Sequence, residues 1–371
     1  MAAPKASKVY FTDMRTCQGN DLLHKMERLL RRAGLDRMDL DGKLVAIKLH
    51  MGEPGNLAYV RPSLAAVLVR MVKEKGGRPF LTDCNTLYMG RRANAVDHLN
   101  SAMENGFNRI AVGCDVIIAD GLRGNEHREV LIEKELCRTA KIGSAIADAD
   151  AVISLTHFKG HDLTGFGGTL KNLGMGSGSR CGKMEMHASS KPTVDRRKCV
   201  GCGLCARSCP EGAITIDEKR KAVIDHGKCV GCGQCVAVCQ HGAPEVEWEG
   251  SSEIVNKKIA EYAYAVLHDK PHFHVSVLMD ISPNCDCWTF NDVPIVPDIG
   301  FAASRDPVAL DMACARLVNE AEAERGSVLG TRGAEGDKFK AVHPATDWMT
   351  GLEHAERIGL GKRAYELVRL K

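Results

Sequence analysis

A repeated four-cysteine pattern is the feature that most constrains this chain. Two runs share the spacing C-x2-C-x2-C-x3-C, and their cysteines are Cys199, Cys202, Cys205, Cys209 and then Cys229, Cys232, Cys235, Cys239. Thiolates at this spacing hold four-iron four-sulfur clusters. The competing interpretation is a pair of zinc sites, but zinc is usually held by two C-x2-C pairs. The repeat therefore predicts two [4Fe–4S] clusters.

The fourth cysteine of each run is expected to serve the other cluster, as it does in two-cluster ferredoxins. The first cluster is then held by Cys199, Cys202, Cys205 and Cys239. The second is held by Cys229, Cys232, Cys235 and Cys209. Between the runs lies AITIDEKRKAVID, two short strand-like segments around a charged turn, which predicts the hairpin of a ferredoxin.

The cysteine runs occupy only a small part of the 371 residues. A compact unit in mid-chain indicates insertion at a surface loop of a larger host. We therefore predict a host domain split into residues 1–190 and 248–371. The inserted unit, residues 191–247, is predicted to be a ferredoxin-like α+β module with two clusters.

The host sequence alternates strand-like and helix-like segments. KVYFTD, KLVAIKLH, RPFLTD, AVISLTHF and HFHVSVLMDI read as strands. Amphipathic segments separate them, and NDLLHKMERLLRRAG is expected to form a helix with Asn20 as its N-cap and Gly34 at its end. Such alternation predicts an α/β fold in which helices cover both faces of a largely parallel sheet.

Polar side chains follow several predicted strands at the point where each strand ends. Because ligands of parallel sheets bind beyond the carboxyl ends of the strands, these positions predict a cleft. The candidate ligand-binding residues there are Lys48, His50, Glu53, Asp83, Asn85 and Asn172. The candidate catalytic residues are His157, Lys159, His161 and Lys171. For any single residue, a hydrogen-bonded loop position is the simpler explanation.

A glycine-rich segment, HFKGHDLTGFGGTLKNLGMGSGSR, contains several of these candidates. Its backbone N–H groups could approach an anion closely. Gly165, Gly167 and Gly168, together with Lys171, are therefore candidates to hold a small anionic ligand such as a phosphate or carboxylate. A tightly turned connection would explain the glycines equally well.

Cys285 and Cys287 form a separate C-x-C pair. Thiolates and imidazoles together suit zinc, iron or nickel. We therefore consider an additional metal or ligand site at this pair, facing His157 and His161, with Asp280 and Asp286 as hydrogen-bond partners of the histidines. The alternative is that both are ordinary cysteines.

Long motifs give the chain a family resemblance. They are KLHMGE at 48–53, TDCNTLYMGRR at 82–92, THFKGHDLTGFGGTLKNLGMG at 156–176 and DISPNCDCWTFNDVPIVPDIG at 280–300. With these motifs the chain resembles the domain-of-unknown-function 362 family of iron–sulfur proteins. That resemblance implies an iron–sulfur protein of anaerobic bacteria or archaea. The stretch HFKGHDLTGFGGTLK is also similar to a loop of lactate-racemase-type proteins, which place His and Lys around a nickel-bearing cofactor.

Three functions are compatible with the sequence. The first is an oxidoreductase that passes electrons through two clusters to a substrate or metal in the α/β cleft. The second is a dedicated electron carrier or an assembly or docking partner, and the third is a non-redox enzyme with structural clusters. A redox partner protein or a small-molecule substrate is expected, and a homo-oligomer is compatible with the sequence.

The net charge of +3 gives no reason to expect nucleic acid. We recognise no apolar run of about 20 residues and no secretory signal, so a cytoplasmic protein without membrane insertion is expected.

Overall fold

The computed structural model describes residues 6–88, 90–187, 191–209, 211–229, 234–245, 251–332 and 336–370. Cys232, an expected cluster ligand, lies outside the described residues. So do residues 190, 247 and 248 at the expected edges of the inserted module.

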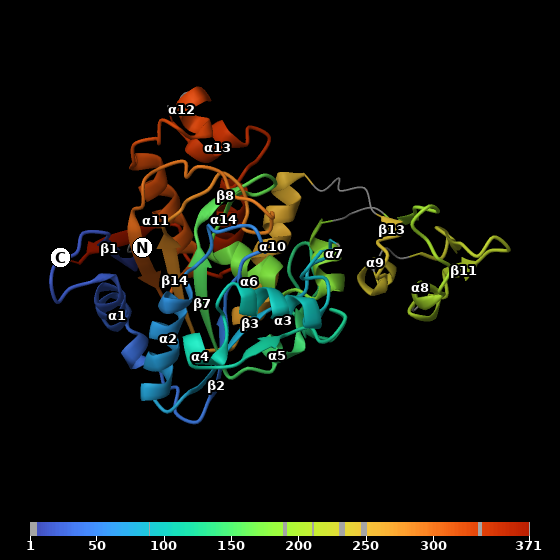
Figure 1. The fold of residues 1–371 in the computed structure, drawn as a ribbon, viewed down its shortest axis with the longest axis horizontal. Helices are drawn as coiled ribbons and strands as arrows, with labels where there is room; N and C mark the ends of the chain where they lie inside the picture. Colours follow the sequence, from blue (N-terminus) through green and yellow to red (C-terminus); the bar gives the residue numbers. More distant parts are fainter. Residues whose placement is uncertain are drawn as a thin grey trace.

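One large sheet organises the fold (Figure 1). Its eight strands, among the described residues, are in spatial order β16 (Tyr365–Arg369), β1 (Ser7–Asp13), β15 (Gly300–Ser304), β14 (His272–Leu278), β7 (Ala151–His157), β2 (Leu44–Lys48), β3 (Arg78–Asp83) and β4 (Val116–Ile118). Within this sheet β15 pairs antiparallel with β1 and β14, and the other pairs are parallel. This arrangement confirms the predicted α/β fold with a largely parallel sheet.

Helices cover both faces of the sheet, because its strands are apolar on both sides. On β7, Ile153 and Leu155 pack with one apolar cluster, to which α1 (Leu22–Ala33) and α2 (Pro62–Glu74) contribute. Val152 packs with the other, which includes residues of α6 (Thr169–Ser177), α10 (Ser252–Leu267) and α11 (Pro307–Glu320). Neighbouring residues of a strand point to opposite faces of the sheet, so a continuous apolar run is buried on both faces.

Shorter elements complete the host. They are η1 (Leu35–Arg37), α3 (Ala95–Glu104), α4 (Arg109–Val112), β5 (His127–Leu131), β6 (Thr139–Gly143), α5 (Ser144–Ala147), β8 (Lys159–His161), β9 (Gly165–Gly167), α7 (Arg180–His187), α12 (Val328–Arg332), α13 (Lys338–Val342) and α14 (Met349–Arg357). Among the helices that the structure describes, none is both long enough and apolar enough to cross a bilayer.

Residues on both sides of the predicted module contribute to the large sheet. β7 precedes the cysteine runs and β14 follows them, yet the two strands are parallel neighbours, with Ile153 paired with Phe273. Between them in sequence lie β10 (Thr193–Val194), α8 (Leu204–Arg207), β11 (Ile214–Ile216), β12 (Ala222–Ile224), α9 (Gln234–Val238) and β13 (Pro244–Glu245). These elements lie together at one end of the molecule, beyond α7 and α10 (Figure 1).

Two small antiparallel pairs shape this cysteine-rich segment. β11 and β12 form a hairpin between the two cysteine runs, with Ile214 opposite Ile224. β10 pairs with β13, with Thr193 opposite Glu245, so the entry and the exit of the segment lie side by side. Neighbouring chain ends of this kind are what an insertion at a loop needs. The domain division itself stays a prediction.

Candidate functional site

Charged side chains gather where β2, β3, β7 and β14 end. These strands are parallel neighbours, so their carboxyl ends share one edge of the sheet. Lys48 ends β2, Asp83 ends β3 and His157 ends β7, and all three side chains are buried. The fold therefore brings together side chains that are far apart in the sequence.

Lys48 and Asp83 form a buried ion pair at this edge. The ammonium of Lys48 lies 2.9 Å from Asp83 Oδ1 and donates to Asn172 Oδ1 at 2.9 Å. Burial would raise the pKa of Asp83, but Lys48, together with His98, His50 and Lys183, holds that pKa well below its usual range. Burial also lowers the pKa of Lys48. Asn172 in turn donates to Thr156 Oγ1 at 2.9 Å, which fixes α6 against β7.

A second buried pair adjoins the first. Arg92 Nε donates to Glu53 Oε2 at 2.6 Å, and the guanidinium also donates to the hydroxyl of Tyr88. Burial opposes the charge of Arg92, but Tyr88 and Glu53 raise its pKa. Our sequence analysis proposed Glu53 and missed Arg92, although Arg92 ends the motif TDCNTLYMGRR.

Two neutral histidines border these pairs. Burial, assisted by Arg92, lowers the pKa of His50 to about 3, and burial lowers that of His98 to about 3. His50 Nδ1 accepts from the N–H of Gly52 at 3.0 Å, so Nε2 carries the ring proton. Among the described residues, that Nε2 and both ring nitrogens of His98 have no hydrogen-bond partner. Buried polar atoms of this kind can take up a small polar ligand.

His157, Lys159 and Asp286 form the next part of the site. His157 Nδ1 lies 2.7 Å from Asp286 Oδ1, and its Nε2 lies 2.8 Å from the carbonyl oxygen of Met279. Lys159 Nζ lies 3.1 Å from the other oxygen of Asp286. Burial would raise the pKa of Asp286, but His157 and Lys159 hold it at about 2. His157 is therefore engaged by Asp286, while Asp280 pairs with Arg61 at the surface.

The other candidate histidine lies at the C-x-C pair. One ligand atom from each of His161, Cys285 and Cys287 lies within 4.8 Å of the other two, a group that can hold a metal ion. Lys171 Nζ lies 3.8 Å from Cys285 Sγ. The structure thus places His161 at the cysteines, where the sequence predicted both His161 and His157, and it adds Lys171, which the sequence had assigned to the glycine-rich segment.

The protonation of His161 bears on what this group can bind. Its Nδ1 accepts from the N–H groups of Leu163 at 3.0 Å and Thr164 at 3.3 Å. Those hydrogens are fixed by the backbone, so the proton of the neutral ring is on Nε2. The ring also hydrogen-bonds to Cys285, and Nε2–H is then the donor. A metal on Nε2 would have to displace that proton, so this geometry favours a hydrogen-bond donor over a metal ligand.

The glycine-rich segment binds a carboxylate that belongs to the protein itself. The N–H groups of Thr169 and Leu170, at the start of α6, donate to Asp311 of α11 at 2.6 and 2.9 Å. A Cβ on Gly168 would come within 2.6 Å of the same carboxylate, which is why glycine is needed there. Gly165 and Gly167 form β9, paired with β8. Lys171 contacts Cys285 instead, so these residues do not form one external anion site.

Replacing Asp311 with alanine should therefore destabilise the host. The two N–H groups of Thr169 and Leu170 would lose their acceptor in a buried place, which costs about 1–3 kcal/mol in the free energy of unfolding. Urea unfolding of the wild type and the variant measures this loss. Asp311→Asn keeps one acceptor oxygen and should lose less. Equal stability of all three proteins would contradict this role.

Asn85, the remaining candidate of the cleft, points toward β4. Its backbone N–H and its Nδ2 both donate to Asp120 Oδ1 at 2.9 Å. Burial raises the pKa of Asp120 to about 6. Asn85 thus belongs to a polar contact with Asp120, whose charge opposes the effect of burial that lowers the pKa of Arg180, and not to the cysteine end of the site.

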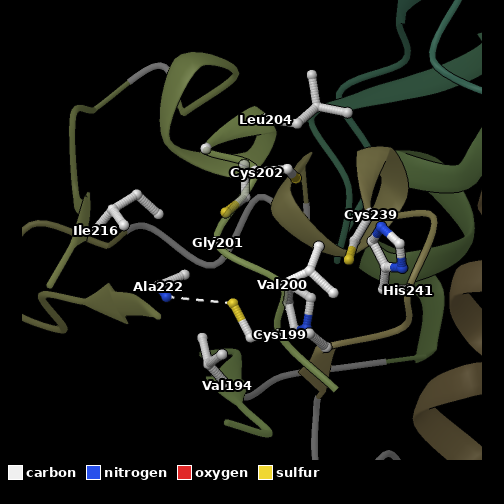
Figure 2. A pocket seen from close by; sticks show the side chains of 14 residues that line it. Val194, Cys199, Val200, Gly201, Cys202, Leu204, Ile216, Ala222, Cys239 and His241 are labelled. Carbon is white, nitrogen blue, oxygen red and sulfur yellow. Dashed lines mark hydrogen bonds between the residues drawn. The ribbon is translucent and has the colours of Figure 1, made fainter. Parts of the chain in front are cut away.

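The cysteine runs form a second candidate site. A cavity, part of it open to solvent, is lined by Cys199, Cys202, Cys205 and Cys239. Figure 2 shows the sulfur atoms of Cys199, Cys202 and Cys239 around this space. Burial raises the pKa of Cys205, and the neighbouring thiols of Cys239, Cys199 and Cys202 add to that effect.

Backbone donors accompany the sulfurs. The N–H of Ala222 donates to Cys199 Sγ at 3.3 Å (Figure 2), and the N–H of Ala213 donates to Cys209 Sγ at 3.3 Å. Both donors belong to the segment between the runs. N–H donors stabilise thiolates and tune a bound cluster. Cys235 is buried, and Cys209 and Cys229 are partly exposed.

Comparisons with known proteins place the chain in a family. A search of the curated proteins finds no match. Among solved structures, the lactate racemase apoprotein from Thermoanaerobacterium thermosaccharolyticum is similar at 12% identity and a TM-score of 0.37, covering 74% of this chain and 51% of that one. A structural-genomics protein from Thermotoga maritima matches at 12% identity and a TM-score of 0.35, covering 69% of this chain and 49% of its own.

The chain thus spans about half the length of the solved structures that it matches. The profile of the family described as "Domain of unknown function (DUF362)" matches residues 45–316. That range includes the charged edge of the sheet, the cysteine runs and the C-x-C pair. The chain therefore belongs to the DUF362 family.

Proposed function

We propose that this protein binds two [4Fe–4S] clusters and passes electrons to a substrate or metal in the α/β cleft, as an oxidoreductase. The cavity formed by Cys199, Cys202, Cys205 and Cys239 carries the proposal. It joins three cysteines of the first run to the last cysteine of the second run. Crossed ligation of this kind is the signature of two-cluster ferredoxins, and a pair of separate zinc sites gives no reason for it.

The second cluster is proposed at Cys209, Cys229, Cys232 and Cys235. Cys209 ends the first run, and Cys235 is the second residue of α9. The module would then hold two one-electron carriers in an inserted ferredoxin-like fold. When bound, the clusters supply reversible one-electron transfer, and the protein sets their potential through hydrogen bonds, burial and nearby charge.

Contacts between the cysteine-rich segment and the host support a role in the cleft. Leu87 and Met184 of the host belong to the same apolar cluster as Cys199, Cys205 and Cys235. Arg180, also of the host, donates to the carbonyl oxygens of Leu87 at 3.1 Å and of Val236 at 3.3 Å. Asp83, the last residue of β3, lies at the charged edge, and Leu87 in the following loop lies at the cysteine-rich segment, so one short stretch of chain joins the two sites.

The partners follow from the same proposal. A redox partner protein would supply the electrons, and the substrate would be a small molecule or a protein group that reaches the cleft. Lys48, Arg92, Lys159 and Lys171 are cations at the cleft, and each lies near an anionic or thiol group. Their role would be to hold and orient a polar substrate.

The test is an iron and sulfide analysis of protein purified without oxygen. We expect about eight irons per chain and a broad thiolate-to-iron absorption that dithionite bleaches. Electron paramagnetic resonance of the reduced protein should show two interacting clusters. Stoichiometric zinc with no iron would contradict the proposal. Clusters that dithionite cannot reduce would support structural clusters in a non-redox enzyme instead.

A further inference from the structure

The C-x-C pair lies in a tight turn that brings its two sulfurs together. Trp288 N–H donates to the carbonyl oxygen of Cys285 at 3.1 Å, so Asp286 and Cys287 are the central residues of the turn. The N–H of Cys287 donates to Cys285 Sγ at 3.4 Å, and the two Sγ atoms are within 4.8 Å. The sulfurs converge because the chain turns, and not because alternate residues of a strand share a face.

A disulfide can form here without unfolding the turn. Two residues of chain reach at most about 7 Å between Cα atoms, and a turn shortens that reach. A disulfide needs roughly 4.4–6.8 Å between its Cα atoms. Side-chain rotation is therefore the main movement that the two sulfurs require.

The surroundings of Cys285 favour a thiolate. Lys171 Nζ is 3.8 Å from its sulfur, His161 and the thiol of Cys287 hydrogen-bond to it, and the N–H of Cys287 adds a further donor. Hydrogen bonding from Cys287 and the charge of Lys171 lower the pKa of Cys285 despite burial. Thiolates beside a cation are the reactive form of cysteine.

We infer that Cys285 and Cys287 form a redox-active dithiol that closes to a disulfide, and that the clusters, when bound, would supply the two electrons that reopen it. This inference rests on the proposed cluster function. The disulfide, two electrons and one proton give the thiolate of Cys285 and the thiol of Cys287. The disulfide needs two electrons, and two clusters that each carry one electron can together supply them. A single cluster would have to be reduced a second time to complete the reaction.

The oxidant that closes the pair is a disulfide substrate. In thiol–disulfide exchange the dithiol attacks a substrate disulfide through a mixed disulfide, and the second cysteine releases the substrate as two thiols. Cys287 is partly exposed, whereas Cys285 is buried. Trp288 and Phe290, next in the chain, expose 45% and 52% of their surface. Cys287 is therefore the sulfur that a substrate reaches first, and it attacks once its proton has passed to the Cys285 thiolate along the hydrogen bond between them.

The experiment follows the pair in the cluster-loaded protein under anaerobic conditions. The protein is treated with glutathione disulfide, free thiols are alkylated with iodoacetamide, and the peptide that carries both cysteines is weighed. We expect an internal disulfide, seen as two unalkylated cysteines and a loss of two hydrogens. Dithionite-reduced clusters should then reopen it. Cys287→Ser should show no such bond, and Cys17→Ser, at an exposed cysteine elsewhere, should behave as wild type.

A cluster-deficient variant, Cys239→Ser, controls for direct reduction by dithionite and should reopen the disulfide more slowly.

Lys171→Met should slow alkylation of the reduced pair about tenfold at neutral pH, as one unit in the thiol pKa implies. Insulin, used as the oxidant in place of glutathione disulfide, tests whether the substrate is a protein disulfide or a small one. Turnover with either oxidant supports the inference.

Three outcomes would overturn the inference. One is a pair that stays as free thiols in glutathione disulfide. Another is a bound metal that the Cys285→Ser, Cys287→Ser double variant loses. Loaded clusters that cannot reopen the disulfide would also refute it, while leaving the proposed cluster function intact. Conversely, protein that contains no iron when purified without oxygen, yet closes its disulfide in glutathione disulfide, would refute the cluster function and leave the dithiol.

Discussion

Replacing Cys239 with serine should remove the cluster bound by Cys199, Cys202 and Cys205, although Cys239 ends the other cysteine run. The reason is that these four cysteines line one cavity. Serine is a far weaker ligand than a thiolate for iron–sulfur clusters. Iron should fall from about eight to about four atoms per chain, measured by iron analysis of anaerobically purified protein.

Double variants decide which cluster is lost. If Cys199 and Cys239 share a cluster, Cys199→Ser added to Cys239→Ser should remove no further iron. Cys229→Ser added to Cys239→Ser should remove nearly all of it. Cys181→Ser is the matched control, because this buried cysteine contacts Gln234 of α9 yet belongs to neither run. The opposite pattern, with Cys229 behaving as the partner of Cys239, would show that ligation is not crossed.

Replacing Lys48 with methionine should cost about 3–5 kcal/mol in the free energy of unfolding, the usual cost of leaving a buried carboxylate without its partner. Asp83 is 3% exposed and Lys48 is 1% exposed, so water cannot replace the lost charge. Urea unfolding measures the loss. Lys43→Met is the matched control, since Lys43 pairs with the exposed Asp39 and should cost less than about 1 kcal/mol.

The effect of Lys48→Met should depend on pH. In the wild type the pKa of Asp83 is lowered, so its contribution is present above the ordinary carboxyl pKa of about 3.9 and is lost as the pH falls through the lower folded value. Without Lys48, burial raises that pKa, and protonation at acid pH relieves the unpaired charge. The gap between wild type and variant should therefore shrink on acidification.

A second substitution tests the pairing directly. Asp83→Asn added to Lys48→Met removes the unpaired charge and should recover part of the lost stability. A double variant as unstable as the sum of the two single variants would show that the ion pair contributes little.

Local sequence signals predicted most of the host. The apolar runs became the parallel strands β2, β3, β7 and β14, because burial on both faces demands continuous apolar sequence. Helix α1 ends at Gly34 as expected, where a φ of 102° suits glycine. Its start is one residue later than expected, since Asp21 accepts from the N–H groups of Leu23 and His24. Asn and Asp are comparable caps, so sequence could not choose between neighbours.

The partners of the candidate residues were harder to predict. Lys48 and Asp83 were chosen as strand ends, but their pairing depends on β2 and β3 being neighbours. The sequence did not predict Arg92 and His98 as site residues, because neither lies at the end of a predicted strand. It did not predict the role of Asp311, because this residue lies within an amphipathic helix, where an acidic residue usually faces solvent. No local pattern marks a side chain whose partner is more than a hundred residues away.

By itself, the sequence determined the cysteine spacing, the strand and helix periods and the polar residues at strand ends, because each of these depends on neighbours within a few positions. The tertiary structure decided which of them meet. It places Cys239 beside three cysteines of the first run. The N-terminus of α6, after Gly168, binds the carboxylate of Asp311. His157 contacts Asp286, whereas His161 and Lys171 contact Cys285. Those choices follow from strand order and chain turns, which are set by packing across the whole molecule.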